Sequence, residues 1–89
     1  MIKYYEIKMW YGKHETTPYS GVKPCIANDL YNGIYHYAEV NNELKKLNIR
    51  LLEWELPKTV AKLIRTPKLS EELANYEPRV VREFISKEE

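Results

Sequence analysis

The segment 28–48, NDLYNGIYHYAEVNNELKKLN, carries the clearest helical pattern in the chain. On a wheel of 100° per residue, its apolar side chains share one broad arc, and most of its Asn, Glu and Lys side chains lie opposite. The apolar members are Leu30, Ile34, Tyr37, Ala38, Val40, Leu44 and Leu47. Asn28 is a favourable N-cap, and Lys45 and Lys46 suit the last turn. The pattern predicts one long amphipathic helix over 28–48 with a buried apolar face.

Alternating side chains on either side of this helix predict two strands. In residues 2–12, Tyr5 and Ile7 lie on one face, and Glu6 and Lys8 lie on the other. Residues 49–56, IRLLEWEL, repeat the alternation and end before Pro57, which cannot donate a hydrogen bond within a sheet. We therefore expect an α+β fold in which a small sheet of two or three strands packs on the long helix.

The rest of the chain predicts a loop and short C-terminal helices. Residues 14–27 contain two prolines and a glycine, which favour a loop. Helical spacing and start signals predict short helices over 59–65, over 70–76 and from Pro78 to residue 85. No repeat or linker divides the sequence, so we expect a single domain over 1–89.

Composition excludes several classes of protein. The chain is 44% hydrophobic and 12% aromatic, which is too high for a disordered protein. No apolar run approaches the roughly 18 residues of a membrane span, and no signal-peptide pattern is present. We therefore expect no membrane partner and a cytoplasmic location. A net charge of +1 argues against a protein whose main task is coating nucleic acid.

Residues that could support catalysis or bind a metal are few. Cys25, His14 and His36 do not supply the four ligands of a structural zinc site, so we expect no metal and no other cofactor. Polar residues surround His14, but no pattern sets the geometry of a base and a nucleophile. The three glycines are scattered and form no phosphate-binding loop. We expect a protein without enzymatic activity.

Aromatic residues outside the predicted core indicate a protein-binding surface, because Tyr and Trp often anchor interfaces. The candidates are Trp10, Tyr11, His14, Tyr19, Tyr35 and His36. We therefore expect a small protein-interaction module: an adaptor, a subunit or an inhibitor. Its size and composition are typical of accessory proteins from phages and other mobile elements. A homodimer is a further hypothesis.

The alternative is a nucleic-acid-binding regulator. The first predicted strand mixes basic and aromatic residues, as single-strand-binding surfaces do, and the segment 58–68 is basic without one acid. The candidate residues are Lys3, Lys8, Trp10, Lys13, Lys58, Lys62, Arg65 and Lys68. Glu6 and the near-neutral total charge weigh against this alternative.

Overall fold

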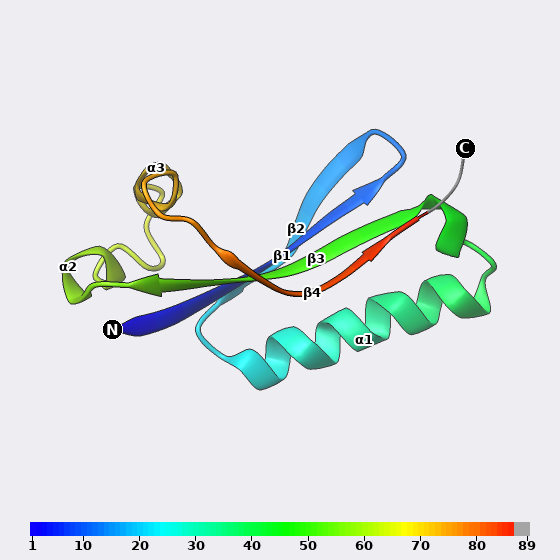
Figure 1. Cartoon of the computed structure of the whole chain (residues 1–89), viewed down its shortest axis with the longest axis horizontal. Coiled ribbons are helices and arrows are strands. Elements are labelled where there is room, and N and C mark those ends of the chain that lie inside the picture. The colour runs from blue at the N-terminus through cyan, green and yellow to red at the C-terminus, as the bar shows by residue number, and fades with distance from the viewer. Residues whose placement is uncertain (87–89) are drawn as a thin grey trace.

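A four-stranded antiparallel sheet forms the centre of the protein, with its strands in the order β2-β1-β3-β4 (Figure 1). The computed structural model describes residues 1–86. Along the chain its elements are β1 (Ile2–Tyr11), β2 (His14–Gly21), α1 (Pro24–Val40), the 3₁₀ turn η1 (Leu44–Lys46), β3 (Leu47–Leu56), α2 (Lys58–Ala61), α3 (Leu69–Leu73) and β4 (Arg79–Ile85). The central strands β1 and β3 pair along all 10 residues of each. The result is a small α+β fold.

The predicted sheet of two or three strands near 2–12 and 49–56 is wrong, because two further strands flank the central pair. Residues 14–27, predicted as a loop, contain β2, and the segment after Pro78, predicted as a helix, contains β4. Two threonines and Tyr19 in β2, and Val80, Val81 and Phe84 in β4, favour strands. Pairing with β1 and β3 satisfies their backbone groups, so tertiary contacts override the local loop and helix signals.

The predicted long helix over 28–48 is also wrong. The helix that forms, α1, has 17 residues and starts earlier, with Pro24 in its first turn. Proline is tolerated there because the backbone N–H that it lacks would have no hydrogen-bond acceptor within the helix. It ends because the Asn41 side chain caps the Tyr37 carbonyl at 2.8 Å and Asn42 takes a left-handed φ of 57°. Leu44 therefore lies in η1 and not in the helix, although it still packs on the core.

The C-terminal helices are shorter and fewer than predicted. Only α2, with 4 residues, and α3, with 5 residues, form. The chain between them turns through Arg65, whose φ of 77° is left-handed. Within residues 1–86, no helix is both long and apolar enough to cross a lipid bilayer.

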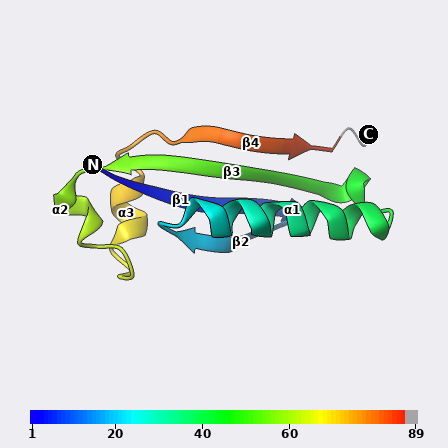
Figure 2. The same cartoon turned by 90° about the horizontal axis from the view of Figure 1, so that it is seen from below.

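The two faces of the sheet are covered differently (Figures 1 and 2). On one side, which we call the helix face, α1 packs over the sheet. The buried residues of this core are Tyr5, Ile7, Ala27, Tyr31, Ala38, Leu47, Ile49 and Leu51. On the other side, α2 and α3 cover one end only. The buried residues there are Tyr4, Trp54, Leu56, Val60, Leu69 and Leu73.

A buried carboxylate, that of Glu53, links three strands on the helix face. It accepts hydrogen bonds from the Tyr5 hydroxyl at 2.9 Å and from Arg79 at 3.1 Å. Lys3 lies 4.0 Å away. Burial alone would raise the pKa of the Glu53 carboxyl, but the hydrogen bonds from Tyr5 and Arg79 and the nearby positive charges outweigh burial and lower it. Glu53 therefore ties β1, β3 and β4 together as a charged group.

Candidate functional site

The first candidate site is the part of the second sheet face that α2 and α3 leave uncovered, which we call the open face. All four strands contribute side chains to it. They include Glu6, Lys8 and Trp10 of β1, Glu15 and Thr17 of β2, Asn48 and Arg50 of β3, and Glu83 and Ile85 of β4. The strand register sets Lys8 opposite Arg50 and Trp10 opposite Asn48. An antiparallel sheet often leaves one face to solvent, and such a face can accept a partner.

Trp10 is the largest apolar side chain on the open face. The Arg50 guanidinium lies over its ring, 5.7 Å from the centroid, within the range of a cation–π contact. Trp10 is half-buried, so part of the indole ring is accessible. The ring borders a hollow of about 350 Å³, whose other lining residues are Gly12, Asn48, Arg50 and Ile85. A fixed aromatic ring beside a hollow is the geometry of an interface anchor.

Both cations of the open face are paired with carboxylates. Arg50 Nε lies 2.9 Å from the Glu83 carboxylate, and Lys8 Nζ lies 3.5 Å from that of Glu6. Lys8 also donates a hydrogen bond to the Thr17 hydroxyl at 3.1 Å. Because both cations have a carboxylate neighbour, this face offers little uncompensated positive charge for a phosphate backbone.

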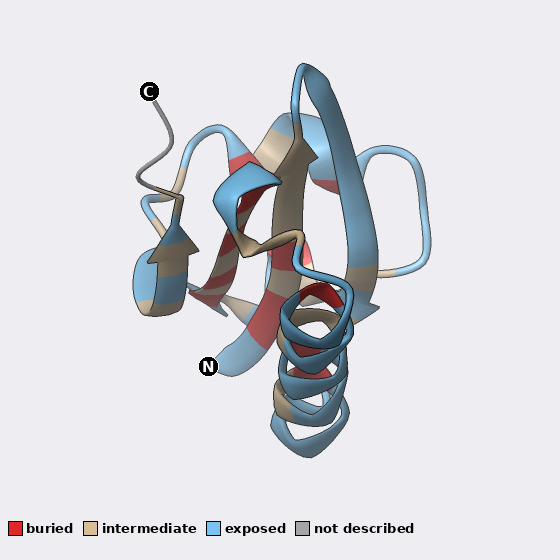
Figure 3. Cartoon of the chain, turned by 90° about the vertical axis from the view of Figure 1, so that its right-hand side faces the viewer, coloured by how far each residue is buried: buried red, intermediate tan, exposed pale blue. Residues whose placement is uncertain are grey.

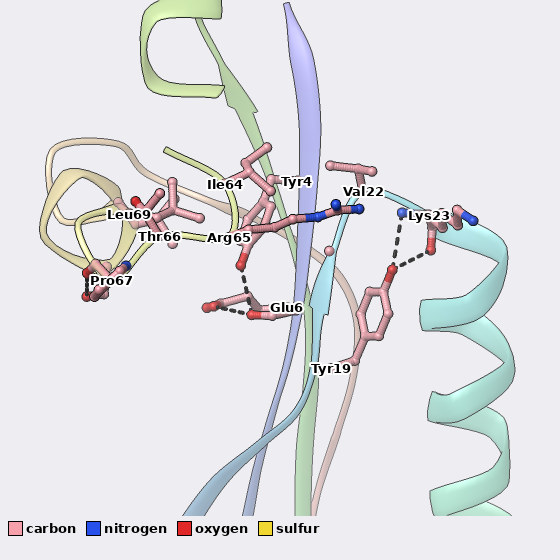
Figure 4. A pocket seen from close by; sticks show the side chains of 14 residues that line it. Tyr4, Glu6, Tyr19, Val22, Lys23, Ile64, Arg65, Thr66, Pro67 and Leu69 are labelled. Carbon is pink, nitrogen blue, oxygen red and sulfur yellow. Dashed lines mark hydrogen bonds between the residues drawn. The ribbon is translucent and has the colours of Figure 1, made fainter. Parts of the chain in front are cut away.

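A cleft of about 480 Å³ is the second candidate site, and Figure 4 shows it from close by. Its walls are the end of β2 and the segment 64–73, and its apolar lining comes from Tyr4, Val22, Ile64, Pro67 and the two leucines of α3. The Arg65 side chain reaches across the cleft toward Val22 (Figure 4). The volume falls within the range of roughly 300–1,000 Å³ that is usual for ligand pockets. The cleft adjoins the open face, because Glu6 belongs to both.

A chain of hydrogen bonds runs along the cleft wall. The Tyr4 hydroxyl donates to Ser20 Oγ at 2.8 Å, and the Ser20 hydroxyl donates to Glu6 at 2.9 Å. Burial raises the pKa of the Tyr4 phenol. None of the described residues that line the cleft is a histidine, so Ser20 lacks the base of a hydrolase triad there. The arrangement suits binding better than acid–base chemistry, and the absence of enzymatic activity stays a prediction.

The six predicted partner-binding residues do not share one surface. Trp10 lies on the open face, whereas Tyr11 points to the helix face and donates a hydrogen bond to Glu43. Burial and then this hydrogen bond raise the pKa of Tyr11 to about 12. Tyr19 packs against the core under α1 and hydrogen-bonds the backbone of Lys23. Of these three aromatic residues, only Trp10 belongs to the open face.

The remaining three lie elsewhere. Tyr35 is half-buried on α1 and packs edge-on against Phe84, with ring centroids 5.2 Å apart. His14 is exposed at the start of β2. His36 is exposed on α1, 3.9 Å from Glu39.

The predicted nucleic-acid-binding residues are also dispersed. Lys3 lies beside Glu53 on the helix face, whereas Lys8 and Trp10 lie on the open face. Lys13 is in the turn between β1 and β2, far from the segment 58–68 (Figure 1). That segment holds Lys58, Lys62, Arg65 and Lys68. These eight side chains do not form one continuous basic surface.

Metal-binding groups are scattered as well. In the described part of the chain, no three His, Cys, Asp or Glu side chains are grouped so that they could hold a metal ion. Cys25 is exposed in the first turn of α1, and the two histidines lie on different elements. The expected absence of a metal and of a cofactor remains a prediction.

Comparisons of the chain with protein-family models, with curated proteins and with solved structures found no match. The chemistry of the open face and of the cleft is therefore the basis for a functional proposal. Site geometry is in any case a better guide to function than fold.

Sequence reasoning missed most residues of the open face, among them Asn48, Arg50, Glu83 and Ile85. The sequence predicts a helix over Glu83 and Ile85, but both lie in β4. This segment has no alternation of polar and apolar residues, and the available signal was its content of Val, Ile and Phe, which favour strands. The Arg50–Glu83 pair has no sequence signal, since the register of β3 and β4 creates it.

Proposed function

We propose that this protein is a non-enzymatic protein-interaction module and that a folded partner protein docks on the open face. The position of Trp10 carries the proposal. Its indole is half-buried, lies under the Arg50 guanidinium and borders a hollow on a sheet face without a covering helix. Tryptophan and arginine are enriched among the residues that dominate binding energy at interfaces.

The charge pattern of the open face supports a protein partner over nucleic acid. The pairs Arg50–Glu83 and Lys8–Glu6 compensate both cations of the open face, and Glu15, which the register sets opposite Trp10, adds a negative charge that would repel a phosphate backbone. Interface cores are typically depleted in net charge and enriched in aromatic residues and arginine. The neighbouring cleft offers a place for one apolar side chain of the partner. Whether the module is an adaptor, a subunit or an inhibitor follows from the partner.

The test is affinity capture followed by reconstitution. Tagged parent protein, Trp10→Ala and Asn32→Ala are incubated with native lysate, with and without nuclease. Asn32 is an exposed residue of α1 and lies outside the open face, so it is the control. Captured proteins are identified, purified and titrated against each variant.

We expect a discrete protein that survives nuclease and binds Trp10→Ala at least 10-fold more weakly, as loss of a hot spot of about 2 kcal/mol implies. Asn32→Ala should bind like the parent. Equal affinity of the parent and Trp10→Ala would contradict the proposal. Capture that nuclease abolishes would favour the nucleic-acid alternative, whose affinity should also fall steeply with salt. We keep the cytoplasm as the proposed location, and cell fractionation tests it.

A further inference from the structure

Helix α1 carries two rows of apolar side chains, and the sheet covers only one of them. The covered row comprises Ala27, Tyr31, Ile34 and Ala38. The second row comprises Ile26, Leu30, Tyr37 and Val40, whose exposed fractions are 43%, 36%, 66% and 65%. At 3.6 residues per turn, the second row lies about 100° around the helix from the first. Figure 3 shows the outer surface of α1 largely in the colour of exposed residues.

The second row and Gly33, which together we call the α1 stripe, follow the spacing of a helix–helix seam. Residues 26, 30, 33, 37 and 40 are separated by alternating steps of four and three, the pattern of a heptad seam. The opposite flank of α1 is occupied, because Asn28 and Tyr35 contact Arg82 and Phe84 of β4. The stripe therefore lies on the flank that faces away from β4 (Figure 2).

Gly33 has no packing role within the chain. A Cβ added at this position would meet no atom within 4 Å, and its φ is not in the left-handed region. Glycine in a helix interior is unfavourable relative to alanine. A close approach of a second helix gives Gly33 a role, because a missing side chain lets two helix backbones come together.

The stripe is complementary to itself. If a second copy of α1 packs antiparallel with the two Gly33 residues at the crossing point, Ile26 comes opposite Val40 and Leu30 comes opposite Tyr37. On the flank of the same seam, Asp29 comes next to His36, whose imidazole can donate a hydrogen bond or carry a positive charge. The two helix dipoles also run in opposite directions. We propose that the protein forms a homodimer through the antiparallel α1 stripes.

The composition of α1 favours a second copy over a lipid surface. The 17 residues of α1 include neither Lys nor Arg, whereas helices that lie on anionic membranes usually carry these residues on their polar face. A helix of 17 residues is about 25 Å long, so the interface is small and the dimer should be reversible, with a dissociation constant in the micromolar range.

This dimer goes beyond the proposed function and does not depend on it. Because α1 covers the side of the sheet opposite the open face, each copy would keep its Trp10 accessible. The dimer would therefore present two open faces, and a partner with two equivalent sites would bind it with avidity.

Sedimentation velocity from about 5 to 500 µM tests the dimer at the micromolar affinity expected for a small interface. The variant that combines Tyr37→Glu with Val40→Glu changes two exposed positions of the stripe. Asn32→Glu places one such charge at an exposed position about 120° around the helix from the stripe and is the control. Circular dichroism and melting at low concentration confirm that each variant is folded.

We expect the parent and Asn32→Glu to show a monomer–dimer equilibrium and the double variant to dimerise at least 10-fold more weakly. A parent that stays monomeric at the highest concentration overturns the proposal. A double variant that dimerises like the parent also overturns it, because the contact then lies on another surface.

Disulfide trapping tests the antiparallel register. In a Cys25→Ser background, which removes the exposed native thiol, chains with Ile26→Cys are mixed with chains with Val40→Cys and oxidised gently. The antiparallel register predicts that the 26–40 crosslink dominates. A dominant 26–26 crosslink would mean parallel packing and would overturn the proposed arrangement. Mixing the same chains with Tyr37→Glu added to both should reduce the 26–40 product.

Discussion

The two faces of the sheet are built from alternating residues of the same strands, yet they have different tasks. On β3, Leu51 is fully buried under α1, while its neighbour Arg50 lies on the open face and pairs with Glu83. The helix face holds the chain together by excluding water from apolar side chains. The open face has few apolar side chains, and part of the Trp10 ring is accessible there. Stability and recognition can thus be changed separately, and the following variants test that separation.

The largest effect is expected in the core of the helix face. Leu51→Ala removes a side chain with no exposed surface and leaves a cavity, so it should destabilise the protein by about 3 kcal/mol. Urea denaturation measures the loss. Glu83→Ala, on the neighbouring strand but on the open face, should cost less than about 1 kcal/mol. Equal losses for the two variants would mean that the faces do not differ as described.

The second effect concerns the buried carboxylate. Glu53→Gln weakens the hydrogen bonds to Tyr5 and Arg79 and should cost about 2 kcal/mol at pH 7. Because the native pKa of Glu53 is lowered, its contribution is complete above the unfolded pKa and is lost as pH falls through the native value.

Urea midpoints measured from pH 7 down to pH 3 test this linkage. The difference in stability between the parent and Glu53→Gln should shrink below about pH 4.5, near the ordinary pKa of glutamate. A difference that stays constant across this range would contradict a charged native Glu53.

The third effect is on the rim of the same core. Tyr11→Phe removes the hydrogen bond to Glu43 and should cost about 1 kcal/mol at neutral pH. The pKa of Tyr11 is raised to about 12, so its contribution is complete below the ordinary value near 10 and is lost as pH rises toward 12. Alkaline melting curves should therefore converge for parent and variant. Curves that stay parallel up to pH 11.5 would argue against the raised pKa.

The smallest effect belongs to the open face. A double-mutant cycle on Arg50→Ala and Glu83→Ala should give a coupling energy of about 0.5 kcal/mol, because both side chains are well exposed. Denaturation at low and high salt measures it, and salt should reduce it. A coupling above about 2 kcal/mol would show that this pair supports the fold and is more than a surface contact.

The sequence predicts strands best where the alternation of side chains is strong. Residues 2–12 and 49–56 lie close to β1 and β3, and in β3 buried and half-buried positions alternate from Leu47 to Glu53. β2 could not be found in this way, because an edge strand with most of its residues exposed carries no apolar alternation. Leu44 and Leu47 fit the helical arc of α1, but Leu44 packs on the core from η1 and Leu47 is buried in β3. The spacing of apolar residues therefore indicates which side chains are buried, but it does not determine whether a helix, a turn or a strand carries them.

Of the predicted site residues, only Trp10 and Lys8 lie on the open face, and Tyr19 and Arg65 line the cleft. Tyr35 looks free on a helical wheel, yet β4 supplies Phe84 as its neighbour. The accessible side chains of an open sheet face depend on strand order, which joins residues from four separate segments. Composition and spacing hold no information about that order.

The strand order also sets the order of events during synthesis and folding. β1 and β2 form a local hairpin, which can close within microseconds once both have left the ribosome. β3 can pair with the other edge of β1 only later, because α1 and η1 precede β3 in the chain. Until then, one row of backbone hydrogen-bonding groups of β1 is unpaired and can be occupied by other chains. We therefore expect the chain to be most prone to aggregation in the interval before β3 pairs with β1.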